Sequence, residues 1–138
     1  MGREELIEKI REQDFPRNSY VVFGSGPLAA ARIRKTQDID MVVSRKLFDE
    51  LRERGWHEKE GVNGLPILVH KEFEVTRDWR FGPYHPRLEM LLATADHYNG
   101  IPFVNLHEVR NWKKHMGRPK DWHDIELIDQ HLAKKGWM

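Results

Sequence analysis

Apolar residues recur along the chain at two different spacings, which predict an alternation of helices and strands. Leu6, Ile7 and Ile10 fall at helical spacing among charged residues and predict a helix over 3–13. The unbroken apolar run 20–23 is rich in strand formers and predicts a strand that ends where Gly24-Ser25-Gly26-Pro27 forces a turn. The chain therefore opens with a helix, a strand and a tight turn.

The next segments continue this alternation. Residues 28–34 are rich in alanine and are compatible with a helix, whereas 38–43 reads as a second strand. Ser44 is a natural N-cap for a helix that carries Leu47, Phe48 and Leu51 on one face and ends at Gly55.

In the second half, 66–70 and 72–79 predict two strands close enough in sequence to pair, before a turn-rich segment at 82–86. The pattern over 88–99 fits a helix at its start and a strand at its end, so both assignments stay open. Two further helices are predicted over 105–115 and 121–134, separated by Gly117-Arg118-Pro119. These elements predict an α/β fold with a small mixed sheet flanked by helices, and a C-terminal helical pair that closes one side of a cleft.

Length and composition limit the classes of protein to consider. A chain of 138 residues fits a single domain, with a catalytic sheet core over 1–80 and a mainly helical part over 81–138. The 23 basic and 22 acidic residues nearly cancel, so any polyanion site must be local. The absence of cysteine excludes disulfides and thiolate metal sites. The charged segment 1–14 does not read as a signal peptide, and no apolar run approaches the length needed to span a bilayer. We therefore expect a cytoplasmic protein with no membrane association.

Two carboxylates on one strand are the strongest candidates for chemistry. Asp38 and Asp40 lie two residues apart, so their side chains leave the same face while Ile39 and Met41 point to the other. Adjacent carboxylates repel each other unless a cation lies between them, and hard carboxylate oxygens suit magnesium together with substrate phosphates. This pair therefore predicts a magnesium site.

A third acid is expected from the segment 72–79, where Glu72, Glu74 and Asp78 alternate onto one face. Glu74 is the preferred candidate because the apolar residues on either side of it would anchor its strand in the core. Asp78 remains the alternative.

The turn that follows the first strand is a candidate phosphate site. Gly24 and Ser25 precede a predicted helix, so backbone amides and the serine hydroxyl could donate to phosphate oxygens. Arg34 and Lys35, just ahead of the acidic pair, would add positive charge.

Taken together, Gly24-Ser25 followed after a helix by Arg34-x-Thr36-x-Asp38-Ile39-Asp40 resembles the DNA polymerase beta-like nucleotidyltransferase superfamily. A second match, Trp112-Lys113 with Gly117-Arg118-Pro119-Lys120-Asp121 and Asp124-Ile125, is similar to the C-terminal helical element of minimal nucleotidyltransferases, including the AbiEii-like toxin relatives. The resemblance implies transfer of a nucleoside monophosphate from an NTP to an acceptor hydroxyl on RNA, protein or a small molecule.

The resemblance also implies roles for individual residues. Three acids would be catalytic and would hold one or two magnesium ions, with manganese as a substitute: Asp38, Asp40 and Glu74. The nucleotide would be bound by a second set, with Asp121 also lining the cleft: Gly24, Ser25, Arg34, Lys113, Arg118 and Lys120. A homodimer or a partner protein is compatible with this small chain. The alternative is a noncatalytic nucleotide-binding or antitoxin-like partner with the same fold.

Some prominent residues have simpler interpretations. The segment from Arg118 to Asp121 could serve only as a helix start, with Asp121 near the positive end of the helix dipole. The eight histidines show no metal-ligand spacing and are expected at the surface. The tryptophans are expected to form core and cleft walls.

Overall fold

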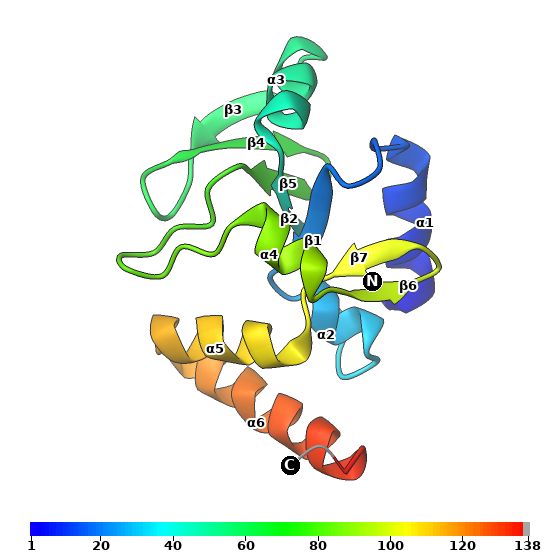
Figure 1. The fold of residues 1–138 in the computed structure, drawn as a ribbon, viewed down its shortest axis with the longest axis vertical. Helices are drawn as coiled ribbons and strands as arrows, with labels where there is room; N and C mark the ends of the chain where they lie inside the picture. Colours follow the sequence, from blue (N-terminus) through cyan, green and yellow to red (C-terminus); the bar gives the residue numbers. More distant parts are fainter. Residues whose placement is uncertain (137–138) are drawn as a thin grey trace.

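The computed structural model describes residues 1–136, which form a mixed sheet with helices on both faces (Figure 1). The helices are α1 (Arg3–Gln13), α2 (Gly26–Ala30), α3 (Arg45–Glu53), α4 (Leu88–Ala93), α5 (Leu106–Met116) and α6 (Pro119–Lys134). The strands are β1 (Tyr20–Phe23), β2 (Ile39–Val43), β3 (His57–Glu60), β4 (Pro66–His70), β5 (Phe73–Thr76), β6 (Asp96–Tyr98) and β7 (Ile101–Phe103). Across this described part of the chain, no helix combines the length and apolar character needed to cross a membrane.

The sheet has the strand order β3-β4-β5-β2-β1-β7-β6. At its centre β1 and β2 are antiparallel, whereas β5 runs parallel to β2 and β7 runs parallel to β1. The outer pairs β3–β4 and β6–β7 are antiparallel hairpins. The sequence prediction of an α/β fold built on a small mixed sheet is confirmed.

One face of the sheet is covered by α1 and α3. Leu6, Ile7 and Ile10 of α1 and the apolar face of α3 pack against alternate residues of β1, β2 and β5. Ser44 caps α3 as predicted, since its hydroxyl accepts a hydrogen bond of 3.1 Å from the backbone N–H of Leu47.

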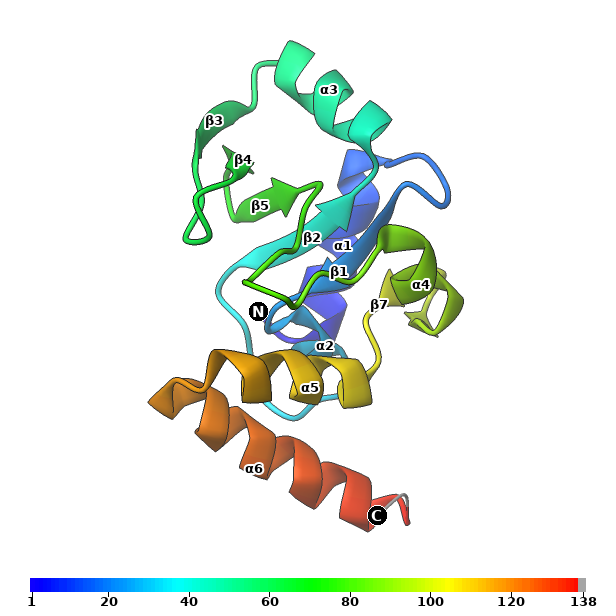
Figure 2. The same ribbon diagram turned by 60° about the vertical axis from the view of Figure 1, so that its left-hand side comes forward.

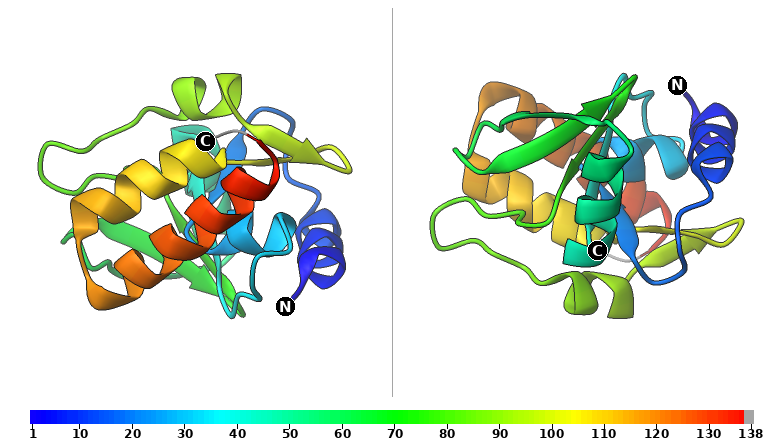
Figure 3. Two further views of the ribbon diagram at one scale, coloured as in Figure 1. Left: turned by 90° about the horizontal axis from the view of Figure 1, so that it is seen from below. Right: turned by 90° about the horizontal axis from the view of Figure 1, so that it is seen from above.

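The opposite face is covered by α4, α5 and α6, and the last two helices pack against each other below the sheet (Figure 2). Val21, Phe23 and Val42 pack on this face together with Val109, Trp112 and Ile128 of the helical pair. Views along the long axis show α5 and α6 lying side by side across one end of the molecule (Figure 3). The two faces explain why β1 reads as an unbroken apolar run, because all four of its residues are buried.

Several element boundaries differ from the sequence prediction. The helix expected over 28–34 is the shorter α2, because the chain leaves helical geometry at Arg32, whose φ is +60°. The strand expected over 72–79 is only β5, so Glu72 and Asp78 lie outside it. The ambiguous segment 88–99 contains both predicted forms, helix α4 and then strand β6.

Two strands were not predicted. The residues of β3 are charged or polar at every position and all exposed, so this edge strand lacks the alternation that marks a half-buried one. The three residues of β7 form too short a run to stand out, although pairing with β1 buries all of them.

Candidate active site

A pocket of about 550 Å³ lies where the central sheet meets the helical pair. Its lining includes all the residues predicted to be catalytic or nucleotide-binding: Gly24, Ser25, Arg34, Asp38, Asp40, Glu74, Lys113, Arg118 and Lys120. These residues come from β1–α2, β2, β5 and the α5–α6 pair, so only the tertiary fold brings them together.

The acids stand on the sheet wall of this pocket. Asp40 of β2 and Glu74 of β5 are paired in the parallel register of the two strands, so their side chains leave the same face beside each other. Ile39, Phe73 and Val75 point to the other face and are buried in the core. This packing fixes both strands and holds the two carboxyl groups toward the helical pair.

Asp40 lies in an environment that disfavours its charged form. Burial, followed by the carboxyl of Glu74 and the charge of Asp38, raises the pKa of Asp40 to about 7, and Lys113 offsets only part of this rise. When protonated, Asp40 shares a hydrogen bond with Glu74. The acidic site therefore carries more negative charge than the nearby positive side chain of Lys113 neutralises.

Asp38 immediately precedes β2 and is exposed. Its backbone carbonyl accepts a hydrogen bond of 2.9 Å from the Thr36 hydroxyl, which fixes the entry to the strand. Thr36 in turn is tied by backbone hydrogen bonds to Met1. Asp38 lines the same pocket as Asp40.

The donor set fits a hard divalent cation. Within residues 1–136, no three His, Cys, Asp or Glu side chains are gathered closely enough to form a metal site from protein ligands alone. Magnesium does not require such a cage, because it keeps several waters and is commonly held by one or two carboxylates together with substrate phosphates. The close pair of Asp40 and Glu74, in which burial and the neighbouring carboxylates raise the pKa of Asp40, is therefore a suitable anchor for magnesium.

The turn after β1 packs directly against the acids. Gly24 has a φ of +64°, and a Cβ at this position would lie 2.3 Å from Oδ2 of Asp40. A Cβ on Gly26 would lie 2.4 Å from Cγ1 of Val22. Both glycines are therefore required by close packing, and they place Ser25 at the pocket wall next to the carboxylates.

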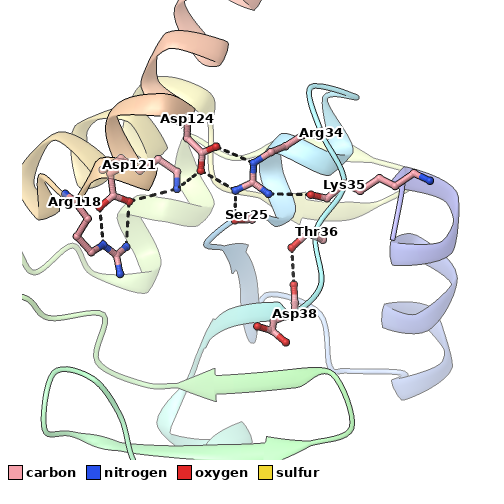
Figure 4. Close-up of polar contacts among 9 residues, drawn as sticks. Ser25, Arg34, Lys35, Thr36, Asp38, Arg118, Asp121 and Asp124 are labelled. Atoms are coloured by element: carbon pink, nitrogen blue, oxygen red, sulfur yellow. Dashed lines mark hydrogen bonds and ion pairs between the residues drawn. The ribbon is translucent and has the colours of Figure 1, made fainter.

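The opposite wall carries a chain of charged side chains from the helical pair (Figure 4). Lys113 is buried, and its Nζ lies 2.9 Å from Oδ2 of Asp124 and 3.7 Å from Oδ1 of Asp121. Arg118 donates to both carboxylate oxygens of Asp121, at 2.6 and 3.1 Å. Arg34 reaches across from the sheet side and joins this chain through Asp124.

A cluster of aromatic side chains lies beside the pocket, and Trp79 and Trp112 of this cluster line it. Trp79 stacks on Phe23 with ring centroids 4.5 Å apart, and Trp112 packs against both at 5.0 and 5.4 Å. Neither indole N–H has a hydrogen-bond partner among the described residues. These rings contribute through packing, as the interpretation of the tryptophans as core and cleft walls predicts.

Four residues singled out from the sequence do not line the pocket, and the first of them is Lys35. Glu72 pairs with Lys9 of α1 at 3.1 Å, and Asp78 faces Arg77 and His85. Asp121 does not line the cleft, because it is fully buried beneath Arg118 and accepts from the backbone N–H of that residue at the start of α6. The interpretation of Asp121 as a helix-start residue therefore describes its position better.

Other pocket residues were assigned no role from the sequence, although Asp124 belongs to the second sequence match. Lys59, Glu60 and Asn63 come from the β3–β4 hairpin, whose first strand was not predicted. Asp124 is almost fully buried on α6, three residues after Asp121 and on the face that carries Ile128. Two carboxylates on the apolar face of an amphipathic helix are a sequence signal that could have identified it.

The fold is that of a nucleotidyltransferase-like domain, the class of fold that the sequence motifs predict. A particular solved structure shares it: the crystal structure of ANT(2")-Ia in complex with adenylyl-2"-tobramycin. The similarity covers 96% of this chain and 88% of the other, with a TM-score of 0.53 and 14% sequence identity. At this identity the likeness shows the fold. No protein-family model and no curated protein sequence matches the chain.

Proposed function

We propose that this protein is a magnesium-dependent nucleotidyltransferase that moves a nucleoside monophosphate from an NTP to an acceptor hydroxyl. One observation carries the proposal: a single pocket has carboxylates on one wall, basic residues on the opposite wall, and the Gly24-Ser25 turn beside both. A triphosphate and its metal ions need this separation of charge, because the chemistry is mainly positioning and charge stabilisation.

The phosphates are assigned to the turn and the helical wall. Gly24 lacks a side chain and lets the backbone approach a phosphate, while the Ser25 hydroxyl donates to a phosphate oxygen. Lys120 is exposed at the rim, and Lys113 and Arg118 add positive charge behind it. This placement holds the triphosphate across the pocket.

The metal is assigned to the acids. Asp38, Asp40 and Glu74 would hold one or two magnesium ions, with manganese as a substitute. The ions would neutralise the charge of Asp40, whose ionisation burial disfavours. Bound there, magnesium would neutralise phosphate charge and lower the pKa of the attacking hydroxyl.

In the proposed step, the acceptor oxygen forms a bond to the α-phosphorus and the bond from that phosphorus to the β-phosphate oxygen breaks. Pyrophosphate leaves with the bonding electrons. Glu74 takes the proton of the acceptor hydroxyl, since it stands beside Asp40 on the wall that faces the substrate.

The acceptor is RNA, a protein hydroxyl or a small molecule. The ANT(2")-Ia structure contains a tobramycin adenylylated at its 2" position, which supports a small-molecule hydroxyl as one acceptor to test. The similarity of the C-terminal motif to AbiEii-like nucleotidyltransferases supports a macromolecular acceptor and a toxin-like role as the other. The proposal also includes a cytoplasmic location and a homodimer or protein partner that enlarges the acceptor site.

The first experiment is a thermal-shift titration of ATP, GTP, CTP and UTP, each with and without magnesium. The wild type is compared with an Asp38→Ala/Asp40→Ala double variant and with Asp78→Ala, whose side chain faces away from the pocket. A ligand that binds only the native state raises apparent stability. We expect a magnesium-dependent shift in the wild type and Asp78→Ala but not in the double variant.

Transfer itself is measured as pyrophosphate release with tobramycin, total tRNA or a protein mixture as the acceptor. Release by the wild type that Asp40→Asn and Glu74→Gln abolish would support the enzyme. Magnesium-dependent NTP binding with no release for any acceptor would instead favour the noncatalytic nucleotide-binding or antitoxin-like partner.

A further inference from the structure

One buried carboxylate joins three separate segments of the pocket. The two oxygens of Asp124 on α6 accept from Nε and Nη2 of Arg34 at 2.8 and 2.7 Å. Nζ of Lys113 on α5 also lies 2.9 Å from Oδ2 of Asp124. Arg34 Nη2 continues to the hydroxyl oxygen of Ser25, at 2.8 Å. Asp124 is therefore linked through one side chain to the turn after β1 (Figure 4).

The side chain of Asp124 is only 5% exposed. Burial opposes its ionisation, but hydrogen bonds and charge from Arg34 and Lys113 outweigh this and hold the pKa of Asp124 below its usual value. A buried carboxylate with both oxygens occupied has one stable orientation. Its partners are consequently fixed with it.

This arrangement changes the part that Arg34 can play. Besides its bonds to Asp124 and Ser25, its Nη1 donates to the Lys35 carbonyl at 2.9 Å, so nearly all its N–H donors are committed. Little of the guanidinium remains to bind a phosphate. The clearest effect of Arg34 is on Ser25, because Nη2 of Arg34 donates a hydrogen bond to the serine hydroxyl oxygen.

A serine hydroxyl carries one hydrogen that rotates to suit its surroundings. Because Arg34 donates to the Ser25 oxygen, that hydrogen must point elsewhere, and Ser25 lines the pocket. The hydroxyl is thus preset as a donor before a ligand arrives, which lowers the reorganisation needed on binding.

We propose that Asp124 is a positioning residue which, through Arg34, orients the Ser25 hydroxyl as a hydrogen-bond donor to a substrate phosphate. The inference rests on the proposed function only in taking nucleotide phosphates as the ligand. In this proposal Asp124 acts only through Arg34 and does not itself bind the phosphate.

Two other roles for Asp124 predict different results. If it only fastened α6 to the rest of the domain, its loss would lower stability without changing phosphate affinity. If it only neutralised Arg34 and Lys113, its loss would free two positive charges and tighten phosphate binding. Only the positioning role predicts that loss of Asp124 weakens phosphate binding in a way that depends on Ser25.

The molecule provides a matched control for the first of these roles. Asp129, also on α6, accepts from Nε and Nη2 of Arg110 on α5 at 2.7 and 3.1 Å, but neither residue lines the pocket. Asp129→Asn therefore removes a more exposed bidentate ion pair between α5 and α6 without touching the phosphate site.

The experiment measures the affinity of inorganic tripolyphosphate with magnesium by isothermal titration calorimetry. The proteins are the wild type, Asp124→Asn, Ser25→Ala, the double variant and Asp129→Asn, with the free energy of unfolding of each measured by urea denaturation. We expect Asp124→Asn to weaken binding about tenfold or more, since a hydrogen bond to a charged group carries roughly that weight. Asp129→Asn should bind like the wild type.

The double variant decides whether the two residues act together. If Asp124 acts through Ser25, adding Ser25→Ala to Asp124→Asn weakens binding little further, because residues in one network are not additive. Additive losses, unchanged affinity in a folded Asp124→Asn protein, tighter binding, or no binding by the wild type would each overturn the proposal. Coupled losses without NTP turnover for any acceptor would refute the proposed transferase activity and leave the positioning role standing.

Discussion

Replacement of Asp40 by asparagine should stabilise the metal-free protein while abolishing its response to magnesium. In the wild type, burial together with Glu74 and Asp38 raises the pKa of Asp40 from 3.8 to about 7. A pKa difference of one between folded and unfolded states is worth about 1.4 kcal/mol. Ionised Asp40 therefore costs the folded state up to about 4 kcal/mol, and asparagine removes the charge with little change in shape.

The pH dependence gives this prediction a definite sign. The folded state holds the Asp40 proton more tightly than the unfolded state, so the stability contributed by this group is complete below pH 4 and lost as the pH rises through about 7. The advantage of Asp40→Asn should be full at pH 8, shrink between pH 7 and 4, and vanish below. We expect a gain of about 1 to 4 kcal/mol at pH 8, or about 3–5 °C in Tm for each kcal/mol.

Urea and thermal unfolding in EDTA at pH 8, 6 and 4 measure this effect, and a second series at pH 8 contains magnesium. Asp78→Asn is the matched control, since that side chain faces Arg77 and His85 outside the pocket. Magnesium should stabilise the wild type and the control but not Asp40→Asn. A variant no more stable than the wild type at pH 8, or one whose gain is the same at pH 8 and pH 4, would refute the reasoning.

Three further substitutions test other parts of the structure. Gly24→Ala should lower the free energy of unfolding by about 2 kcal/mol or more, because the added Cβ would collide with Asp40 and the φ of this residue is positive. A loss below about 0.5 kcal/mol in urea denaturation would contradict this packing. Ser44→Ala removes a helix N-cap far from the chemistry and should cost about 1 kcal/mol in the same assay, with magnesium tripolyphosphate affinity unchanged by calorimetry. Burial opposes ionisation of Asp121, but hydrogen bonds from Arg118 outweigh it and lower the pKa of Asp121. The stability that this carboxylate contributes is therefore present at pH 7 and is lost as the pH falls below about 4. Asp121→Asn should therefore be less stable than the wild type at pH 7, and the urea midpoints of the two proteins should draw together as the pH falls below about 4.

Local sequence determined those parts of the site that depend on backbone periodicity and turn chemistry. Asp38 and Asp40 share a face because strand side chains alternate, and Ile39 between them is buried on the other side. The turn at Gly24 follows from an apolar strand that meets a glycine. Ser44 caps its helix as its position predicts. Each of these features spans only a few residues, so neighbouring residues suffice to specify it.

Tertiary structure decided which distant groups meet. Glu74 rather than Asp78 lies beside Asp40 because β5 pairs in parallel with β2 in one register, and no local pattern specifies that register. Asp124 and Arg34 are 90 positions apart in the sequence. They meet because the helical pair packs on the face of the sheet opposite α1 and α3. The sequence by itself thus determined the acidic strand and its glycine turn. Long-range packing decided which carboxylate lies beside Asp40 and formed the buried charge network, since such contacts depend on burying separate elements together.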